Sequence, residues 1–280
     1  MALSEIIYNL KQSKFIRIVA YPIAKVIRYD RCFRYRFTSD AEKLREYKNK
    51  YEGQRCFVIG NGPSLSVEDL DNLQGEHCFA ANHIYKVFSE TRWRPEFFFC
   101  VDGHVLHDIR NMLENMELEN IFVDMEGKKY NIQGKNKKVT YIYNYCPYSL
   151  NPHNRTNIKM SSDVSRYFVS GATVTYTAIQ MAVYMGFKEI YLLGVDHQYS
   201  KYRDETGALK TNEGVVDHFD GEKSKDYCVQ SVVTTTAAYK AAKEYCDKNN
   251  ITIKNLTRGG ALEVFERANF DEVVSDRKEQ

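Results

Sequence analysis

Two hydrophobic patterns divide the chain. Over residues 3–29, apolar positions recur at roughly helical spacing with Lys and Arg between them, which predicts a basic amphipathic helix. Residues 38–53 are strongly charged and predict a connecting helix. From residue 55 onward, short apolar runs alternate with helical patterns. We therefore predict a helical extension at 1–53 and one larger domain at 54–280.

The apolar runs of the larger domain predict a mostly parallel sheet. "FVIG" and "EIYLLGV" lack the alternation of a strand with one wet face, so we expect helices on both faces. Strands that alternate with helices are typical of a doubly wound, Rossmann-like α/β fold. The predicted strands are 55–60, 77–81, 96–101, 120–124, 138–143, 188–194 and 251–256, and the predicted helices lie near 66–73, 104–116, 171–186 and 229–249.

One long segment interrupts this alternation. Residues 197–228 are polar and contain glycine, and they follow directly on a predicted strand. Loops of this length inside a compact domain are either functional lids or disordered. We interpret 197–228 as a lid.

Charge is unevenly distributed. The 280 residues carry a formal net charge of only +2, which does not favour nucleic-acid binding, but residues 1–36 hold eight Lys or Arg against Glu5 and Asp30. This segment is predicted either to pack on the domain or to contact an anionic membrane surface or a membrane-bound partner. A homo-oligomer is also compatible with the sequence.

The cysteines and the apolar runs indicate a cytoplasmic protein. Seven cysteines form no CxxC pair, and several lie in apolar strand-like runs, as expected for reduced core residues. The longest N-terminal apolar stretch is interrupted by Arg17, Pro22 and Lys25, so we expect no cleavable signal peptide. No run reaches the roughly 18 apolar residues of a spanning helix. We expect attachment at the periphery of the inner membrane.

A glycine turn follows the first predicted strand in "VIGNGPSLSVEDL", residues 58–70. Gly60 and Gly62 permit backbone conformations closed to other residues, and Ser64 or Ser66 can cap the next helix. In doubly wound sheets, ligands bind where strands end and helices begin. The turn is thus either a phosphate or nucleotide cradle or a plain strand-to-helix connection.

Polar residues end other predicted strands. In residues 169–197, Ser170 and Gly171 are expected to open a helix, and the next strand delivers Asp196 and His197 to the same edge of the sheet. Asn82, His83, Asp102 and His104 follow two further strands. His104 and His107 lack a third partner at metal-ligand spacing, so we predict no metal site there.

These motifs resemble a known family. "VIGNGPSL", "AANHIY", "SGATVTYTAIQMAVYMGFKEIYLLGVDH" and "IKNLTRGGALEVFER" are similar to 6-hydroxymethylpterin pyrophosphokinase-like proteins and motility-accessory-factor glycosyltransferases. They resemble, more distantly, the bacterial CMP-sialic-acid sialyltransferases of glycosyltransferase family 42. The resemblance covers about residues 55–270. It implies a Rossmann-like variant of the GT-A glycosyltransferase fold.

The resemblance also implies roles for individual residues. Asn61, Asn82, Ser170 and Gly171 match nucleotide-contacting positions, and Asp102 stands where sialyltransferases have Asn. The family's general-base histidine lies in the lid segment, where His218 is the first candidate and His197 the second. Tyr199 and Tyr202 lie near the positions of two phosphate-binding tyrosines in the sialyltransferases. From the residues themselves, Gly60, Gly62, Ser64 and Asp196 are candidates around the nucleotide, and Arg166 is a candidate clamp for a phosphate or carboxylate.

Three functions follow from the sequence. The first is a glycosyltransferase that moves sialic acid or a related acidic sugar from a CMP donor to a surface-glycan or lipid-linked acceptor, as in lipopolysaccharide or capsule assembly, without a required cofactor. The second is a diphosphokinase for a pterin-type alcohol, with Mg²⁺ held by Asp102, Asp196 and Asp217. The third is a non-catalytic component of a glycan-assembly complex.

Overall fold

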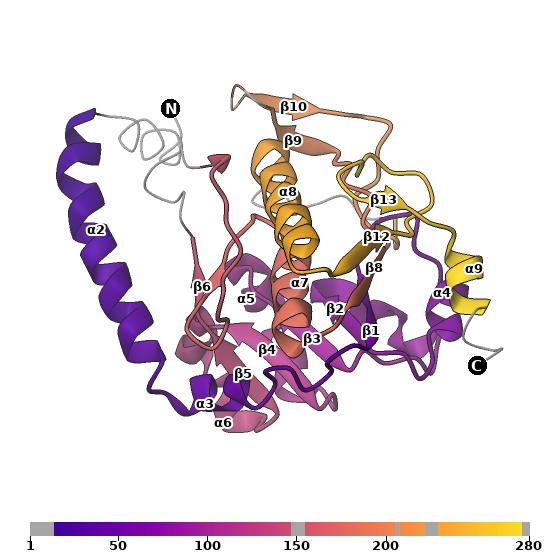
Figure 1. The fold of residues 1–280 in the computed structure, drawn as a ribbon, viewed down its shortest axis with the longest axis horizontal. Coiled ribbons are helices and arrows are strands. Elements are labelled where there is room, and N and C mark those ends of the chain that lie inside the picture. Colours follow the sequence, from indigo (N-terminus) through magenta and orange to yellow (C-terminus); the bar gives the residue numbers. More distant parts are fainter. Residues whose placement is uncertain (1–13, 147–154, 205, 207, 222–228, 276–280) are drawn as a thin grey trace.

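The computed structural model describes residues 14–146, 155–204, 206, 208–221 and 229–275. An eight-stranded, fully parallel sheet forms the centre, with strand order β13-β12-β8-β1-β2-β3-β4-β5 (Figure 1). The strands are β1 (Arg55–Ile59), β2 (Cys78–Ala81), β3 (Phe97–Cys100), β4 (Asn120–Asp124), β5 (Val139–Ile142), β8 (Glu189–Leu193), β12 (Thr252–Asn255) and β13 (Glu266–Arg267).

The chain order confirms the predicted doubly wound α/β fold. The chain builds β1 to β5 in one direction and then returns to add β8, β12 and β13 on the other side of β1. The strand order therefore reverses between β1 and β8. In open parallel sheets, a crevice forms at this reversal, outside the carboxyl ends of the strands.

Helices cover both faces of the sheet, as the continuous apolar strands predict. Cys56 and Val58 of β1 point into one core and Phe57 and Ile59 into the other. The first core includes α3 (Ser39–Arg45), α7 (Val174–Met185) and α8 (Val232–Lys248), and the second includes η1 (Asn82–Ser89), α4 (Val67–Asn72), α5 (Gly103–Glu114) and α9 (Phe270–Ser275). The short elements η2 (Met125–Tyr130) and α6 (Ile132–Lys135) connect β4 to β5.

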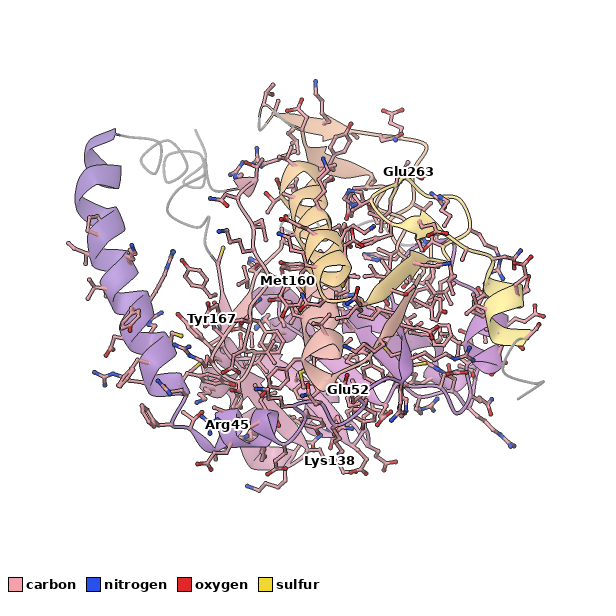
Figure 2. The ribbon with its side chains drawn as sticks, in the orientation of Figure 1. Arg45, Glu52, Lys138, Met160, Tyr167 and Glu263 are labelled. Atoms are coloured by element: carbon pink, nitrogen blue, oxygen red, sulfur yellow. The ribbon has the colours of Figure 1, made fainter. Side chains whose placement is uncertain are left out.

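The region predicted as a lid contains strands. β9 (Lys201–Arg203) lies between β10 (Leu209–Thr211) and β11 (Gln230–Ser231) in a small separate sheet. A two-stranded ladder joins β6 (Asn144–Tyr145) to β7 (Phe168–Val169). Figure 2 shows Glu263 at the end of the molecule where β9 and β10 lie, and Glu52 and Lys138 at the opposite end.

The N-terminal helix α2 (Lys14–Tyr35) stands apart from the sheet in Figure 1. The chain joins the core at Tyr35, whose hydroxyl donates a hydrogen bond of 2.8 Å to the carbonyl oxygen of Tyr141. Ala41 and Leu44 of α3 are fully buried, and Tyr51 also belongs to this core. The part that stands apart therefore ends near Tyr35 rather than at residue 53. Within the described ranges, no helix has the length and apolar character that crossing a membrane requires.

Candidate functional site

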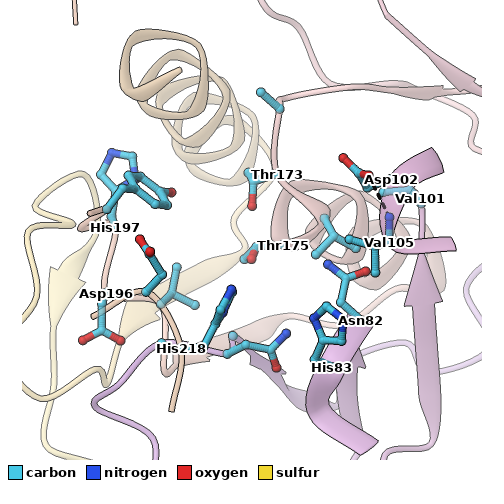
Figure 3. A pocket seen from close by; sticks show the side chains of 18 of the residues that line it. Asn82, His83, Val101, Asp102, Val105, Thr173, Thr175, Asp196, His197 and His218 are labelled. Carbon is cyan, nitrogen blue, oxygen red and sulfur yellow. Dashed lines mark hydrogen bonds between the residues drawn. The ribbon is translucent and has the colours of Figure 1, made fainter. Parts of the chain in front are cut away.

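A cavity of about 820 Å³ lies at the predicted position, at the carboxyl ends of the central strands (Figure 3). Loops after β1, β2, β3 and β8 contribute to its wall, together with the first residues of α7 and α8 and part of the lid. Ten of the residues predicted around the nucleotide, at the phosphate or as the base line it: Gly60, Asn61, Gly62, Asn82, Asp102, Ser170, Asp196, His197, Tyr199 and His218. The residues predicted from separate motifs are thus largely brought together.

Close packing explains the two glycines of the turn after β1. Neither Gly60 nor Gly62 has a positive φ, so the expected conformational reason is wrong. A Cβ on Gly60 would lie 2.1 Å from the carbonyl oxygen of Gly194, and one on Gly62 would lie 1.9 Å from Oδ2 of Asp196. The glycines let the turn pack directly against the loop that follows β8.

Ser64 and Ser66 have different roles in this turn. Oγ of Ser64 donates a 2.7 Å hydrogen bond to Oδ2 of Asp196, which joins the two loops. Burial raises the pKa of Asp196, and hydrogen bonds from Ser64 oppose that shift. Ser66 forms a capping box with Asp69 at the start of α4, as predicted. Ser64 therefore positions Asp196 from outside the cavity wall.

Three non-glycine residues of the cavity wall have left-handed backbones. Asn82, Ala172 and His197 have φ values of 54°, 59° and 54°. Asparagine adopts this conformation readily, whereas alanine does so at a cost of about 1 kcal/mol. Strained backbone of this kind is concentrated at functional sites.

The helix after Ser170 starts later than the sequence predicts. Ala172 turns the chain, so α7 begins at Val174 with Thr173 as its N-cap. Gly171 lies outside the cavity wall, and a Cβ there would be 2.5 Å from Cβ of Ala238 in α8. Ser170 lines the cavity, but it does not cap the helix.

Two helices begin at the cavity without a side-chain cap. Neither Thr173 of α7 nor Ser231 of α8 makes a capping hydrogen bond, and both line the cavity. Backbone N–H groups in a first helical turn have no partner within the helix and favour anions. The cavity wall thus offers backbone N–H groups that can donate hydrogen bonds to a phosphate or a carboxylate.

Amide oxygens also line the cavity. Oδ1 of Asn61, Asn82 and Asn144 are buried and accept no hydrogen bond within the described part of the chain. Nδ2 of Asn61 donates to the carbonyl oxygen of Ala81 at 3.0 Å, which holds its side chain in place. Buried acceptors without partners are costly, so these atoms are suited to ligand hydroxyl or amino groups.

Asp102 caps a helix at the edge of the cavity. Its Oδ1 accepts hydrogen bonds from the backbone N–H groups of His104 and Val105, at 2.8 and 3.1 Å, at the start of α5. Asp102 is exposed and still lines the cavity. The carboxylate at this position therefore has a structural role in addition to any contact with a ligand.

Residues 217–220 of the lid are anchored near the cavity. The backbone N–H of Phe219 donates a 2.9 Å hydrogen bond to the carbonyl oxygen of Asn61. Asp217 accepts hydrogen bonds from the backbone N–H (2.7 Å) and the hydroxyl of Ser200, and Lys86 pairs with Asp220. These contacts hold His218 in the cavity, with its ring centroid 6.3 Å from that of His83.

Both ring nitrogens of His197 lie near hydroxyl groups of the protein. Its Nε2 lies 2.9 Å from Oγ1 of Thr236, and its Nδ1 lies 3.3 Å from the hydroxyl of Tyr199. Burial lowers the pKa of His197 to about 4, so the ring is neutral near pH 7. Burial raises the pKa of Tyr199 far above its usual value, so its hydroxyl remains protonated.

Some residues of the cavity differ from those predicted. Arg166 is exposed, and neither it nor Tyr202 of β9 lines the cavity. Instead, Arg155 and Arg203 supply cations to the wall, and Asn144 supplies an amide. None of these three occurs in a recognisable motif, so the sequence alone offered no signal for them.

Comparisons with known proteins give a family and distant structural neighbours. The sequence model of the 6-hydroxymethylpterin diphosphokinase MptE-like family matches residues 34–202, more than half of the chain. No curated protein matches the chain. The sialyltransferase CstII from Campylobacter jejuni with cytidine-5'-monophosphate is 14% identical over 78% of this chain and 86% of its own, with a TM-score of 0.43. Its complex with CMP-3FNeuAc is 14% identical over 76% and 84%, with a TM-score of 0.38. From the family match, this chain belongs to the 6-hydroxymethylpterin diphosphokinase MptE-like family.

Proposed function

We propose that this protein is a glycosyltransferase that uses a CMP-linked acidic sugar as donor and a glycan or glycolipid as acceptor. The observation that carries the proposal is the hydrogen bond between Phe219 and Asn61, because it ties the segment bearing His218 to the glycine turn. A candidate base and a candidate nucleotide-binding loop therefore share one cavity. The motif resemblance to CMP-dependent sialyltransferases supports the same assignment.

The wall of the cavity suits a nucleotide with an anionic group. The unpartnered amide oxygens of Asn61, Asn82 and Asn144 can accept hydrogen bonds from the hydroxyl and amino groups of a nucleoside. The first turns of α7 and α8 can donate to a phosphate, and Arg155 and Arg203 add positive charge. The cavity would thus recognise the nucleotide-sugar through two kinds of group. Amide oxygens would accept hydrogen bonds from the nucleoside, and N–H groups and guanidinium groups would bind the phosphate.

In the proposed reaction, His218 accepts the proton of the acceptor hydroxyl. The acceptor oxygen forms a bond to the anomeric carbon of the donor sugar, the bond from that carbon to the phosphate oxygen breaks, and CMP leaves with the electron pair. Helix N–H groups and the Tyr199 hydroxyl would stabilise the negative charge on the phosphate. We assign His197 a positioning role, because both of its ring nitrogens are within hydrogen-bond distance of protein groups.

We propose a cytoplasmic location for this reaction. The described cysteines are free thiols, and Cys56, Cys78, Cys100 and Cys246 are buried in the cores. Reduced buried cysteines are typical of reducing compartments.

The family name supports a second candidate, transfer of a diphosphate from ATP to a pterin-type alcohol. Its Mg²⁺ would be held by Asp102, Asp196 and Asp217. In the structure these three carboxylates accept hydrogen bonds from His104, Ser64 and Ser200, respectively, among others. Within the described residues, no three His, Cys, Asp or Glu side chains are grouped so that they could hold a metal. Activity that requires ATP and Mg²⁺ would favour this candidate.

Replacement of His218 tests the proposed base. We expect His218→Ala to reduce sugar transfer from a CMP donor by about 100-fold to 10,000-fold while CMP binding stays unchanged. His107→Ala is the matched control, because His107 is exposed and does not line the cavity. Unchanged transfer by His218→Ala would refute the role of His218. If neither donor hydrolysis nor nucleotide binding is found, a non-catalytic role in glycan assembly is favoured.

A further inference from the structure

The helix α2 has one side attached to the protein. The Arg28 guanidinium carbon lies 5.5 Å from the centre of the Tyr145 ring, and Sγ of Cys32 lies 3.8 Å from the carbonyl oxygen of Arg166. Tyr35 is buried at the end of the helix. These three residues, four and three positions apart, form one face. Figure 2 shows the neighbouring Tyr167 on the side of the body that faces α2.

The remaining surface of α2 carries an exposed apolar stripe. Ile23, Val26 and Ile27 are 57%, 69% and 47% exposed, and Phe33 and Phe37 are 50% and 68% exposed. Their spacing follows the helical repeat and continues into the turn after α2. We call these five residues the apolar stripe. Large apolar side chains that gather on a solvent-facing surface mark an interaction site.

Basic residues border the apolar stripe. Apart from Arg28, which lies on the attached face, residues 22–37 contain four Lys or Arg and one Asp, a net charge of +3. The single Asp30 lies on the stripe and pairs with Arg34 at 2.8 Å. The Arg36 guanidinium carbon lies 5.9 and 5.3 Å from the ring centres of Phe33 and Phe37, so cationic and aromatic groups occur together. This surface combines apolar contact area with uncompensated positive charge.

We propose that the apolar stripe of α2 binds the surface of an anionic lipid bilayer. Helices that lie in a membrane interface have aromatic and aliphatic residues on one face and Lys or Arg beside them, and anionic lipids strengthen their attachment. The charge favours a bilayer over a second copy of this chain, because two α2 surfaces of net charge +3 would repel each other. This inference does not depend on the proposed reaction.

Attachment through α2 would fix the orientation of the enzyme. In Figure 1, α2 extends along one side of the molecule from α3 toward the end where β9 and β10 lie. Arg203 of β9, at that end, lines the cavity. A bilayer bound along α2 would therefore lie beside the protein while the lid end stays accessible to soluble donor.

Vesicle flotation of the full chain tests the inference. We expect binding to vesicles of phosphatidylcholine with phosphatidylglycerol and at least tenfold weaker binding to phosphatidylcholine alone, because each basic residue near an anionic surface contributes roughly fivefold. The double variant Val26→Glu with Phe33→Glu should lose at least about tenfold in affinity for the anionic vesicles. Leu209→Glu is the matched control, since Leu209 is 55% exposed but lies in β10, and it should bind as the wild type does.

Three results would overturn the inference. They are an absence of binding to anionic vesicles, equal binding of the double variant and the wild type, and a dimer that Val26→Glu with Phe33→Glu dissociates without any vesicle binding. Thermal unfolding of each variant, with and without CMP, is measured in parallel. A variant that has a normal unfolding temperature and is still stabilised by CMP, but no longer floats with the vesicles, has lost membrane attachment alone. Failure of this inference can therefore be distinguished from failure of the proposed reaction.

Discussion

The two sides of the cavity are held by different forces. On one side, the glycine turn after β1 packs against Gly194 and Asp196 so closely that a Cβ on Gly62 has no room. On the other side, the lid is attached by a few hydrogen bonds and the Lys86–Asp220 pair, and β10 is exposed throughout. Dense packing transmits strain, whereas a segment held by few contacts opens at lower cost. The difference indicates that the glycine-turn side is rigid and that the lid opens more easily.

The largest effect on stability is expected at Gly62. Gly62→Ala places a methyl group 1.9 Å from Oδ2 of Asp196 and should lower the free energy of unfolding by about 3 kcal/mol, with loss of nucleotide binding. Gly214→Ala in the lid is the control, because its nearest neighbour would be Oδ1 of Asn212 at 3.9 Å. Chemical denaturation measures both. Equal effects of the two substitutions would show that the two sides are packed alike.

His197, where β8 leads into the lid, should make stability depend on pH. Its folded-state pKa of about 4 is below the unfolded value of about 6.5, so the unfolded chain binds more protons between these values. The contribution is complete above about pH 6.5 and is lost as the pH falls toward 4, by roughly 2 kcal/mol between pH 7 and pH 5. His197→Asn keeps a residue that tolerates the left-handed backbone. The denaturation midpoints at pH 7 and pH 5 should differ less in this variant than in the wild type. An equal difference in both proteins would contradict the attribution of this pH dependence to His197.

Asp217 should control the lid more than the overall fold. Asp217→Ala leaves the buried N–H of Ser200 without its acceptor, at a cost of about 1 to 2 kcal/mol. We expect proteolysis of the lid to accelerate about tenfold while the main unfolding transition shifts little. Asp204→Ala is the control, since Asp204 contacts only the β9–β10 hairpin among the described residues, through hydrogen bonds from Thr206 and Ala208 and an ion pair with Lys210 at 3.6 Å. A shift of the main transition as large as that of Gly62→Ala would show that the lid is part of the rigid core.

The smallest effects distinguish two adjacent residues. Ala172→Gly relieves a left-handed alanine and should stabilise the protein by up to about 1 kcal/mol. Gly171→Ala should destabilise it, because the new Cβ would lie 2.5 Å from Cβ of Ala238. Thermal unfolding compares the two. Effects of the same sign would refute the geometry of this turn.

Local patterns predicted the sheet well, because each strand and helix depends on its own residues. All seven predicted strands occur, and the continuous apolar runs at 57–60 and 189–195 correctly indicated helices on both faces. The start of α7 was wrong by three residues, since alanine gives no sign of a left-handed turn at position 172. The predicted basic helix ends at Tyr35 instead of residue 29, and its first residues, 3–13, lie outside the described residues.

The site was only partly predictable, because its remaining features depend on contacts between distant segments. Glycine is needed at positions 60 and 62 because the loop after β8 packs against them, and this loop lies more than 130 positions away in the sequence. Arg155, Arg203 and Asn144 reach the cavity through tertiary structure and belong to no motif. The motifs located the edge of the sheet where the site lies, and the packing defined which side chains face it.

A thermal-shift comparison of nucleotides with and without Mg²⁺ tests the central claim most directly. We predict that CMP and CMP-linked acidic sugars at about 100 times their dissociation constants raise the unfolding temperature by about 5 °C or more in EDTA. Asn61→Ala should largely remove this shift, and UDP, GDP and ADP should produce smaller ones. Stabilisation by ADP or ATP alone, and only with Mg²⁺, would contradict the account and favour diphosphate transfer.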